Sequence, residues 1–303
     1  MSEISVLINN YNYAGFIGDA IRSVLNQTFA DFELIIVDDG STDNSMVVIS
    51  EFNDPRIKTI GKKNGGQLSA FNAGFSASSG RIVCFLDADD LYRKDYLERV
   101  FQFFTDNPDC DCLIGRVEYF GEKTGTDVAL DRSLTDGYIG CAPFSVAVRH
   151  IWRGAPTSAY SIRREFLAKF LPYQEDERFW ITRADDLLVW GADLVNAVKY
   201  CSASLTVLYR IHGNNYFFGK KDQSSEGYQK RKAAAERFCA FVMQRNHLDY
   251  PRMLKDEIRK GNTSFSEKIL AFLKTVRDRM MSASDLCKCA WYLFLSLFYK
   301  FGL

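Results

Sequence analysis

The sequence predicts an α/β fold: a doubly wound, mainly parallel sheet with helices on both faces, followed by a helical C-terminal extension. Short apolar runs alternate with helical repeats over the first hundred residues, and polar clusters follow several of the runs. From about residue 223 the hydrophobic spacing is helical to the end. We therefore divide the 303 residues into two halves of one domain, 1–105 and 106–220, and an extension, 221–303.

Residues 1–105 alternate strand and helix. Short apolar runs suit strands that are buried on both faces, and apolar residues every three or four positions suit helices. The predicted strands are Ile4–Ile8, Glu33–Val37, Ile57–Ile60 and Arg81–Leu86, and the predicted helices carry Ile17 to Leu25, Val48 to Phe52, and Leu68 to Phe75. Such alternation predicts parallel strands joined by helical crossovers.

The remaining elements are less regular. The predicted elements are a strand at Leu113–Phe120, a helix at Arg163–Leu171, a helix opened by Asp185 and Asp186, a strand at Leu205–Ile211, and helices from Gln223 onward. Residues 286–303 are almost wholly apolar, but their uncharged stretch is shorter than the roughly 20 residues that span a bilayer. This segment suits an interfacial helix on a membrane, or a helix docked on the core or on a second copy.

Polar clusters follow three of the strands. Asn9 and Asn10 follow the first strand, Asp38 and Asp39 the second, and Asp87 to Asp90 the fourth. Ligands of open α/β sheets bind beyond the carboxyl ends of the strands. The spacing therefore predicts one binding rim that gathers these side chains.

The composition of the chain argues against several classes of function. Lys plus Arg and Asp plus Glu are both 38, so the net charge is zero, which argues against a nucleic-acid partner. The 8 cysteines include no C-x-x-C pair, which argues against a zinc site and suits reduced thiols. The N-terminus lacks the pattern of a signal peptide. We expect a cytoplasmic protein, with peripheral contact at the inner face of the cell membrane left open.

Four blocks of this sequence resemble the family 2 glycosyltransferases. The blocks are Ile4–Thr28, Phe32–Asp43 with Val37-Asp38-Asp39-Gly40-Ser41, Asn64–Gly74, and Phe85-Leu86-Asp87-Ala88-Asp89-Asp90. The match is dense to about residue 100 and thinner beyond. It implies a GT-A fold and transfer of a sugar from a nucleotide-sugar, in the first place a UDP-sugar, to an acceptor hydroxyl with inversion. It also implies Mg²⁺ or Mn²⁺, and a saccharide or lipid-linked saccharide acceptor in polysaccharide, O-antigen or capsule synthesis.

The resemblance places the donor at the rim. It assigns Asp89 to the metal, Asp87 to the ribose or metal region, and Asp39 to the base. The nucleotide-sugar-binding candidates are Asn9, Tyr11, Asp38, Asp39, Gly66, Gln67, Asn72, Asp87 and Ala88. Carboxylate oxygens are ligands that Mg²⁺ prefers, although the same residues also build plain turns. The family usually has Pro-Thr or a similar small pair where this chain has Asn9-Asn10, which leaves the base preference open.

Further candidates serve the reaction itself. Asp186 is the preferred general base and Asp185 the second choice, although two acids also suit the first turn of a helix. His212 could complete the metal shell or bind the diphosphate, although a lone histidine also suits a structural role. Arg210 could pair with a phosphate or with an internal carboxylate. The acceptor-side candidates are Trp152, Pro156, Thr157 and Ser158. Trp180 is read as a core residue or, less favoured, a sugar-stacking platform.

Two other functions stay open. A sugar-1-phosphate nucleotidyltransferase shares the sheet and the metal, but it grips a triphosphate with a basic loop after the first strand. No Lys or Arg occurs between Met1 and Arg22. A catalytically degenerate sugar-nucleotide-binding protein is the non-enzymatic alternative.

Overall fold

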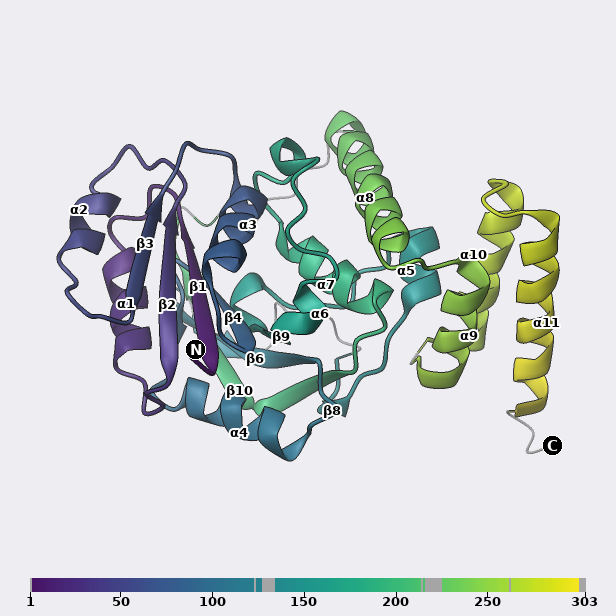
Figure 1. The fold of residues 1–303 in the computed structure, drawn as a ribbon, viewed down its shortest axis with the longest axis horizontal. Coiled ribbons are helices and arrows are strands. Elements are labelled where there is room, and N and C mark those ends of the chain that lie inside the picture. Colours follow the sequence, from purple (N-terminus) through teal and green to yellow (C-terminus); the bar gives the residue numbers. More distant parts are fainter. Residues whose placement is uncertain are drawn as a thin grey trace.

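Ten strands form one sheet across the described residues, and helices pack against both of its faces (Figure 1). The structure is a computed structural model that describes residues 2–122, 124–126, 134–213, 215, 225–261 and 263–299. The strands are β1 (Ile4–Asn10), β2 (Phe32–Asp38), β3 (Ile57–Gly61), β4 (Ile82–Asp87), β5 (Leu91–Tyr92), β6 (Cys112–Gly121), β7 (Gly125–Thr126), β8 (Gly137–Tyr138), β9 (Tyr160–Arg163) and β10 (Lys199–Ile211). Their order is β3-β2-β1-β4-β9-β6-β10-β5, with β7 beside β6 and β8 beside β10.

The register of the parallel strands sets the position of the polar rim. β1 pairs in parallel with β2 and with β4, so Asn10 lies opposite Asp38 and Asn9 opposite Asp87. The three strands thus end level with one another, as the sequence predicts for a mainly parallel sheet. β9 is antiparallel to both β4 and β6 and joins the two groups of parallel strands.

Helices cover the two faces of the sheet. The helices of the described residues are α1 (Ile17–Leu25), α2 (Ser45–Ser50), α3 (Gln67–Ala77), α4 (Tyr96–Asp106), α5 (Pro143–Arg149), α6 (Arg164–Leu167), α7 (Asp185–Leu194), α8 (Ser225–Arg245), α9 (Tyr250–Lys260), α10 (Phe265–Arg277) and α11 (Ala283–Tyr299), with short 3₁₀ turns at η1 (Thr157–Ala159) and η2 (Glu177–Phe179). The last three, α9 to α11, lie beyond the sheet (Figure 1). Side chains of β1 alternate between the faces. Ile4, Val6 and Ile8 join the core under α1 and α4, whereas Leu7 joins the larger core under α3 and α7.

Two of the predicted elements have different bounds. Arg163 ends β9 instead of opening a helix, because its backbone pairs with β4 and its guanidinium donates to the Cys110 carbonyl at 2.6 Å. α6 therefore covers only Arg164–Leu167. β10 begins at Lys199, six residues before the predicted strand, and pairs there with β6. In both places tertiary strand pairing overrides the local pattern.

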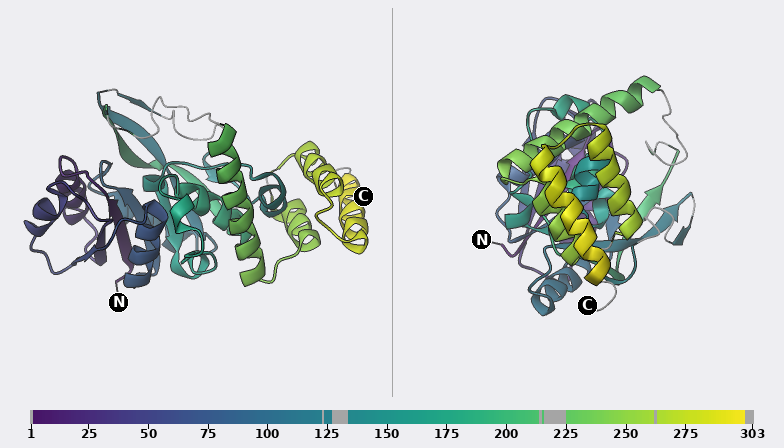
Figure 2. Two further views of the ribbon diagram at one scale, coloured as in Figure 1. Left: turned by 90° about the horizontal axis from the view of Figure 1, so that it is seen from above. Right: turned by 90° about the vertical axis from the view of Figure 1, so that its right-hand side faces the viewer.

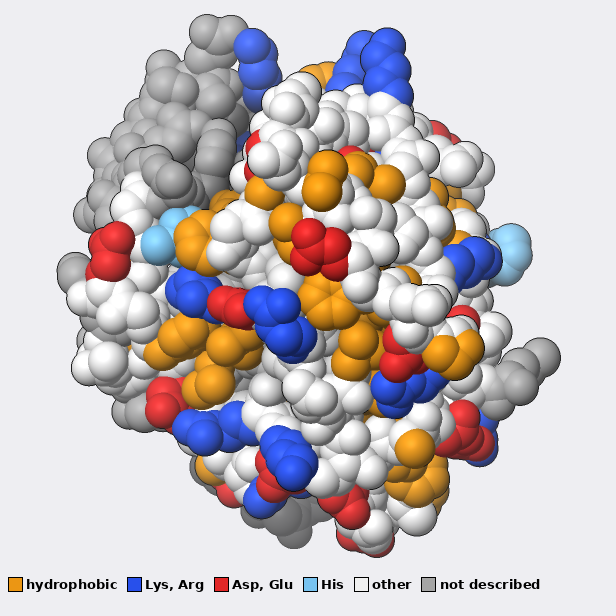
Figure 3. Space-filling model, turned by 90° about the vertical axis from the view of Figure 1, so that its left-hand side faces the viewer, with side chains coloured by type: hydrophobic (Ala, Val, Ile, Leu, Met, Phe, Trp, Pro, Cys, Tyr) orange, Lys and Arg blue, Asp and Glu red, His pale blue; other side chains and the backbone are white. Residues whose placement is uncertain are grey.

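The predicted helical extension is confirmed as α8 to α11, of which α9 to α11 form the end of the molecule farthest from β3 and α2 (Figure 1). α9 packs on α5, and α11 packs on α9. None of the helices in the described residues is long and apolar enough to cross a membrane. Basic and acidic side chains are interspersed on the opposite end of the molecule (Figure 3).

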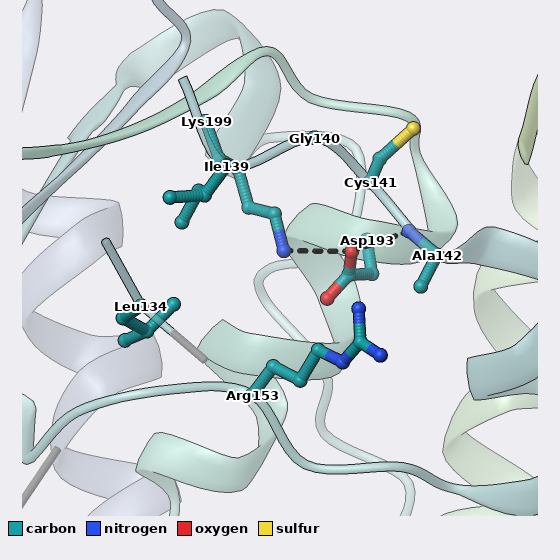
Figure 4. Close-up of a pocket in the computed structure, with 8 residues that line it drawn as sticks. All are labelled: Leu134, Ile139, Gly140, Cys141, Ala142, Arg153, Asp193 and Lys199. Carbon is teal, nitrogen blue, oxygen red and sulfur yellow. Dashed lines mark hydrogen bonds and ion pairs between the residues drawn. The ribbon is translucent and has the colours of Figure 1, made fainter. Parts of the chain in front are cut away.

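A buried ion pair fixes the start of β10. The Asp193 carboxylate accepts hydrogen bonds from Lys199 Nζ and from the Ala142 backbone N–H, both at 2.7 Å (Figure 4). Both side chains are almost fully buried, and a cavity of about 10 Å³ beside them has room for one water. The pair thereby joins α7, β10 and the segment that leads into α5.

Glu257 attaches the extension to the sheet domain. This fully buried carboxylate of α9 accepts hydrogen bonds from the Ser145 backbone N–H at 2.9 Å, from the Ser145 hydroxyl, and from the Thr263 hydroxyl at 2.6 Å. Burial raises its pKa above the usual value for glutamate. Three donors depend on this one side chain.

We predict that Glu257→Leu lowers the free energy of unfolding by about 3 kcal/mol, because it leaves three buried donors without an acceptor. Glu257→Gln keeps one acceptor oxygen and should cost less. Urea denaturation of the full chain measures both. The exposed neighbour on α9 provides the control, since Arg259→Gln should change the free energy by no more than about 0.5 kcal/mol. Equal losses in all three variants would contradict this role of Glu257.

Candidate active site

A cleft of about 980 Å³ opens where β1, β2 and β4 end. Its walls come from the loops after these strands, from the loop after β3, and from segments 152–157 and 181–185, which are distant in sequence. The predicted site residues that line it are Asn9, Tyr11, Asp39, Gly66, Gln67, Asp87, Ala88, Asp89, Trp152, Pro156, Thr157 and Asp185. The structure thus brings the donor-side and acceptor-side candidates together in one cleft.

The acidic turn after β4 is held by residues from three other elements. Asp87 accepts hydrogen bonds from Asn9 Nδ2 at 3.0 Å and from Gln67 Nε2 at 3.3 Å. Ser158 of η1 accepts the Asp87 backbone N–H at 3.0 Å and donates to the buried Asp90 carboxylate at 2.6 Å. These contacts fix the turn and leave Asp87 and Asp89 facing the cleft.

His212 and Arg210, at the end of β10, reach the same turn. His212 Nε2 lies 3.0 Å from Asp89 Oδ2, and its ring packs against Phe16 with centroids 4.5 Å apart. Arg210 donates to the Asp89 carbonyl at 2.9 Å and to the Asp19 carboxylate at 3.0 Å, and its backbone N–H donates to Asp90 at 3.0 Å. Arg210 was predicted to pair with either a phosphate or an internal carboxylate, and in the structure it pairs with the carboxylate of Asp19.

The turn carries more negative charge than its neighbours neutralise. Burial, and next the charge of Asp89, raise the pKa of Asp87 to about 7. Burial and the charges of Asp89 and Asp87 likewise raise the pKa of Asp90 well above its usual range. A divalent cation would relieve this repulsion, and carboxylate oxygens suit Mg²⁺ or Mn²⁺.

No three His, Cys, Asp or Glu side chains among the described residues are placed to hold a metal ion by themselves. A cation at this turn would have to take part of its ligands from outside these side chains. A bound diphosphate can supply such oxygens, because Mg²⁺ is commonly held by one or two carboxylates together with substrate phosphates.

Asp39 binds the loop after β3. Its carboxylate accepts hydrogen bonds from Lys62 Nζ at 2.6 Å, from the Gly65 N–H at 3.0 Å and from the Gly66 N–H at 2.6 Å. Gly66 has φ +89°, and a Cβ there would lie 2.4 Å from Ile181 Cα, so only glycine fits. Asp39 thus lines the cleft while most of its acceptor capacity is used within the chain.

Asn9 and Asn10 each present a buried amide oxygen without a hydrogen-bond partner. The Asn10 amide nitrogen donates to Asp38 Oδ1 at 2.7 Å, and the Asn9 amide nitrogen donates to Asp87. A carboxylate can only accept hydrogen bonds, so the NH₂ group of each amide faces the carboxylate and the amide oxygen points away from it. Both residues line the cleft, and their oxygens are unused acceptors.

The acidic pair at the start of α7 divides between two environments. Asp185 is half-buried and lines the cleft, and burial, followed by the charges of Asp186 and Asp87, raises its pKa to about 8. Asp186 is almost fully buried, does not line the cleft, and pairs with Arg183 at 3.1 Å. The preference for Asp186 over Asp185 therefore does not match their placement: the first residue of the helix faces the cleft, and the second faces inward.

Three other predicted site residues, Asn72, Asp38 and Ser158, do not line the cleft and instead make hydrogen bonds inside the protein. Asn72 is buried, donates to the Tyr173 carbonyl and the Glu177 carboxylate at 2.8 Å each, and accepts the Tyr173 N–H at 2.9 Å. Asp38 is buried and accepts from Asn10 and Ser41. Ser158 positions the acidic turn. A buried amide or carboxylate with all its hydrogen bonds satisfied inside the chain has little left for a ligand.

Several lining residues were not among the predicted site residues. They are Asn12, Tyr13, Phe16, Asn64, Ala70, Tyr119, Ile181, Thr182, Arg183, Tyr209 and Asn215. Asn10, which was predicted to lie at the rim, also lines the cleft. Asn12 and Tyr13 lie within the first resembling block, whereas Ile181 to Arg183 carried no signal. Trp180 is a core residue, 1% exposed, and packs edge-on against Trp190.

Comparison with known proteins places these features in context. Residues 5–168 match the model of the family described as glycosyl transferase family 2. An uncharacterized glycosyltransferase of Nostoc sp. is 37% identical over 77% of this chain and 72% of its own length. Pasteurella multocida chondroitin synthase is 38% identical over 36% of this chain, which is 12% of that enzyme. The structure of S. aureus TarS residues 1–349 in complex with UDP-GlcNAc superposes with a TM-score of 0.62 at 17% identity, over 99% of this chain and 92% of that one.

Proposed function

Because the chain belongs to glycosyl transferase family 2, we propose that it moves a sugar from a uridine diphosphate sugar to an acceptor hydroxyl in a metal-dependent single displacement with inversion. The observation that carries the proposal is the convergence of Asp39, Asp87, Asp89 and Asp185 on one cleft. Acids on both the donor side and the acceptor side of a cleft are what this displacement requires.

The donor lies across the end of β1 in this proposal. Asp87 and Asp89, with His212, would hold Mg²⁺ or Mn²⁺ together with oxygens of the donor, which assigns the diphosphate end of the donor to the region beside β4. The bound cation would neutralise the charge that grows on the departing diphosphate. The end of β2, with Asp39 and Asn10, then receives the nucleoside. Tyr11, which is 45% exposed in the cleft wall, offers a ring face on which a base can stack.

The unused amide oxygens support uracil as the base. Uracil carries a ring N–H, which an acceptor such as Asn10 Oδ1 binds, whereas the corresponding ring nitrogen of cytosine is itself an acceptor. Asp38 fixes the orientation of the Asn10 amide, so the amide cannot rotate to suit cytosine. S. aureus TarS, the structural neighbour, was crystallised with UDP-GlcNAc.

Asp185 acts as general base in the proposed reaction. Its carboxylate takes the proton of the acceptor hydroxyl while the hydroxyl oxygen attacks the anomeric carbon from the face opposite the leaving diphosphate. A raised pKa suits this role, because a stronger base takes the proton more readily. Burial raises the pKa of Asp185, and the negative charge of the neighbouring Asp186 raises it further. Asp186 itself pairs with Arg183.

The acceptor enters past Trp152, Pro156 and Thr157. We propose a saccharide or a lipid-linked saccharide as the acceptor and bacterial polysaccharide, O-antigen or capsule synthesis as the setting, in the cytoplasm or at the inner face of the cell membrane. The proposal rests on family membership and on the position of these residues opposite the donor acids.

We predict that Asp89→Ala lowers Mn²⁺-dependent release of UDP from a UDP-sugar by about a thousandfold, because it removes a carboxylate that would hold the cation. The assay needs no acceptor, since slow hydrolysis of the donor reports the same site. Asp95→Ala, an exposed acid that pairs with Arg99, is the matched control and should retain full activity. Activity that is independent of both Mn²⁺ and Asp89 would exclude this metal site.

We predict that Asp185→Asn lowers kcat of sugar transfer by about 10²–10⁴-fold, whereas Asp186→Asn lowers it by about tenfold or less. The wild type should gain activity with rising pH through a midpoint above the usual carboxylate range near 4. Removing the charge of Asp186 should shift this midpoint to lower pH, because a like charge no longer raises the Asp185 pKa. If Asp186→Asn lowered kcat more than Asp185→Asn, Asp186 and not Asp185 would be the general base.

We predict that the wild type binds UDP at least tenfold more tightly than CDP in the presence of Mn²⁺, and that Asn10→Leu removes this preference. Isothermal titration measures both affinities. Ser41→Ala serves as the control, because it removes another donor to Asp38 without removing the amide oxygen. Equal binding of CDP and UDP by the wild type would show that Asn10 does not select the base.

A further inference from the structure

The hairpin formed by α10 and α11 carries an apolar surface that the remainder of the described chain leaves uncovered. Leu270, Leu273 and Val276 recur every three residues on α10, and Trp291, Phe294 and Leu297 do the same on α11. Each of the six side chains is between 38% and 56% exposed. The opposite faces pack inward through Ala271 and Thr275 on α10 and through Cys289 and Leu293 on α11. We call the six exposed residues the hairpin surface.

The hairpin surface lies at one end of the molecule. In the end-on view α10 and α11 lie in front of the remaining elements (Figure 2). The cleft is built instead at the ends of β1, β2 and β4. Exposed apolar patches of this kind on soluble proteins mark contacts with a protein or a membrane. Because the surface shares no residue with the cleft, its role is independent of the proposed transfer reaction.

Charge around the hairpin surface distinguishes between these partners. The charged side chains of the hairpin that are at least partly exposed are four cations, Lys274, Arg277, Arg279 and Lys288, and three carboxylates, Glu267, Asp278 and Asp285. A two-fold dimer would bring this positive excess against itself. An anionic lipid surface would neutralise it.

The apolar residues match the same partner. Trp291 and Phe294 stack with ring centroids 5.7 Å apart, and aromatic side chains beside cations are typical of helices that lie at the membrane interface. α10 and α11 have 13 and 17 residues, too few to span a bilayer and enough to lie along it.

We propose that the hairpin surface docks the protein on an anionic lipid bilayer, with α10 and α11 lying in the plane of the headgroups. This assignment extends the predicted contact beyond residues 286–303 to include α10. The inner face of α11 docks on α9, which was one of the predicted alternatives, and the exposed outer face is assigned to lipid in preference to a dimer. Residues 300–303 of that prediction lie outside the described residues.

Sedimentation with lipid vesicles tests the proposal on the full chain. The wild type should bind phosphatidylcholine vesicles that contain phosphatidylglycerol and bind pure phosphatidylcholine vesicles much less, and salt should weaken the binding. The double variant Leu273→Glu/Phe294→Glu should bind at least about tenfold more weakly. Lys288→Gln should weaken binding to the charged vesicles by about fivefold, because each cation near the surface contributes separately.

Two controls separate docking from misfolding and from oligomerisation. Val47→Glu, at an exposed position on α2 that is 59% exposed, should bind vesicles like the wild type. All variants should keep Mn²⁺-dependent release of UDP, which shows that the cleft is intact and keeps a failure here distinct from a failure of the proposed reaction. Absence of vesicle binding by the wild type would overturn the proposal. So would a dimer in light scattering that Leu273→Glu/Phe294→Glu dissociates.

Discussion

Electrostatic repulsion among carboxylates is the constraint on which the site depends. Parallel pairing of β1 with β2 and β4 brings their polar ends level. The turn after β4 adds Asp89 to Asp87 in the cleft and places the fully buried Asp90 behind them. Burial, and next the like charges this close, raise the pKa values of Asp87 and Asp90. Much of the surrounding structure serves to hold these acids in place without neutralising them.

The restraints come from elements far apart in sequence. Ser158 and Arg210 bind the acidic turn, Gln67 reaches it from the start of α3, and Asn9 reaches it from β1. Hydrogen bonds from neutral groups orient a carboxylate and leave its charge available for a cation. Arg210 also positions the turn, although its guanidinium is charged, because it donates to the Asp89 carbonyl and to Asp19 and not to the carboxylates of the turn.

Most of the sheet and the donor side of the cleft could be predicted from the sequence. Apolar runs such as Ile4–Ile8 have only one stable environment, and level parallel strands then bring Asp39 and Asp87 together. The acceptor side of the cleft was harder to predict from the sequence. Asp185 and Asp186 are adjacent acids, and only the packing of α7 decides which one faces the cleft. Asn72 belongs to a resembling block, yet it bonds to Tyr173 and Glu177, contacts that no local pattern reveals.

The attachment of α9 and α10 has a practical consequence for work on the isolated catalytic part. Glu257 caps buried donors at the start of α5, and Arg153 pairs with Glu267 of α10 at 2.8 Å, one residue from Trp152 in the cleft wall. Truncating the chain after α8 would therefore expose the inner face of α5 and release the segment that presents Trp152. A minimal fragment for crystallisation should end after α11, even though the sheet is complete by Ile211.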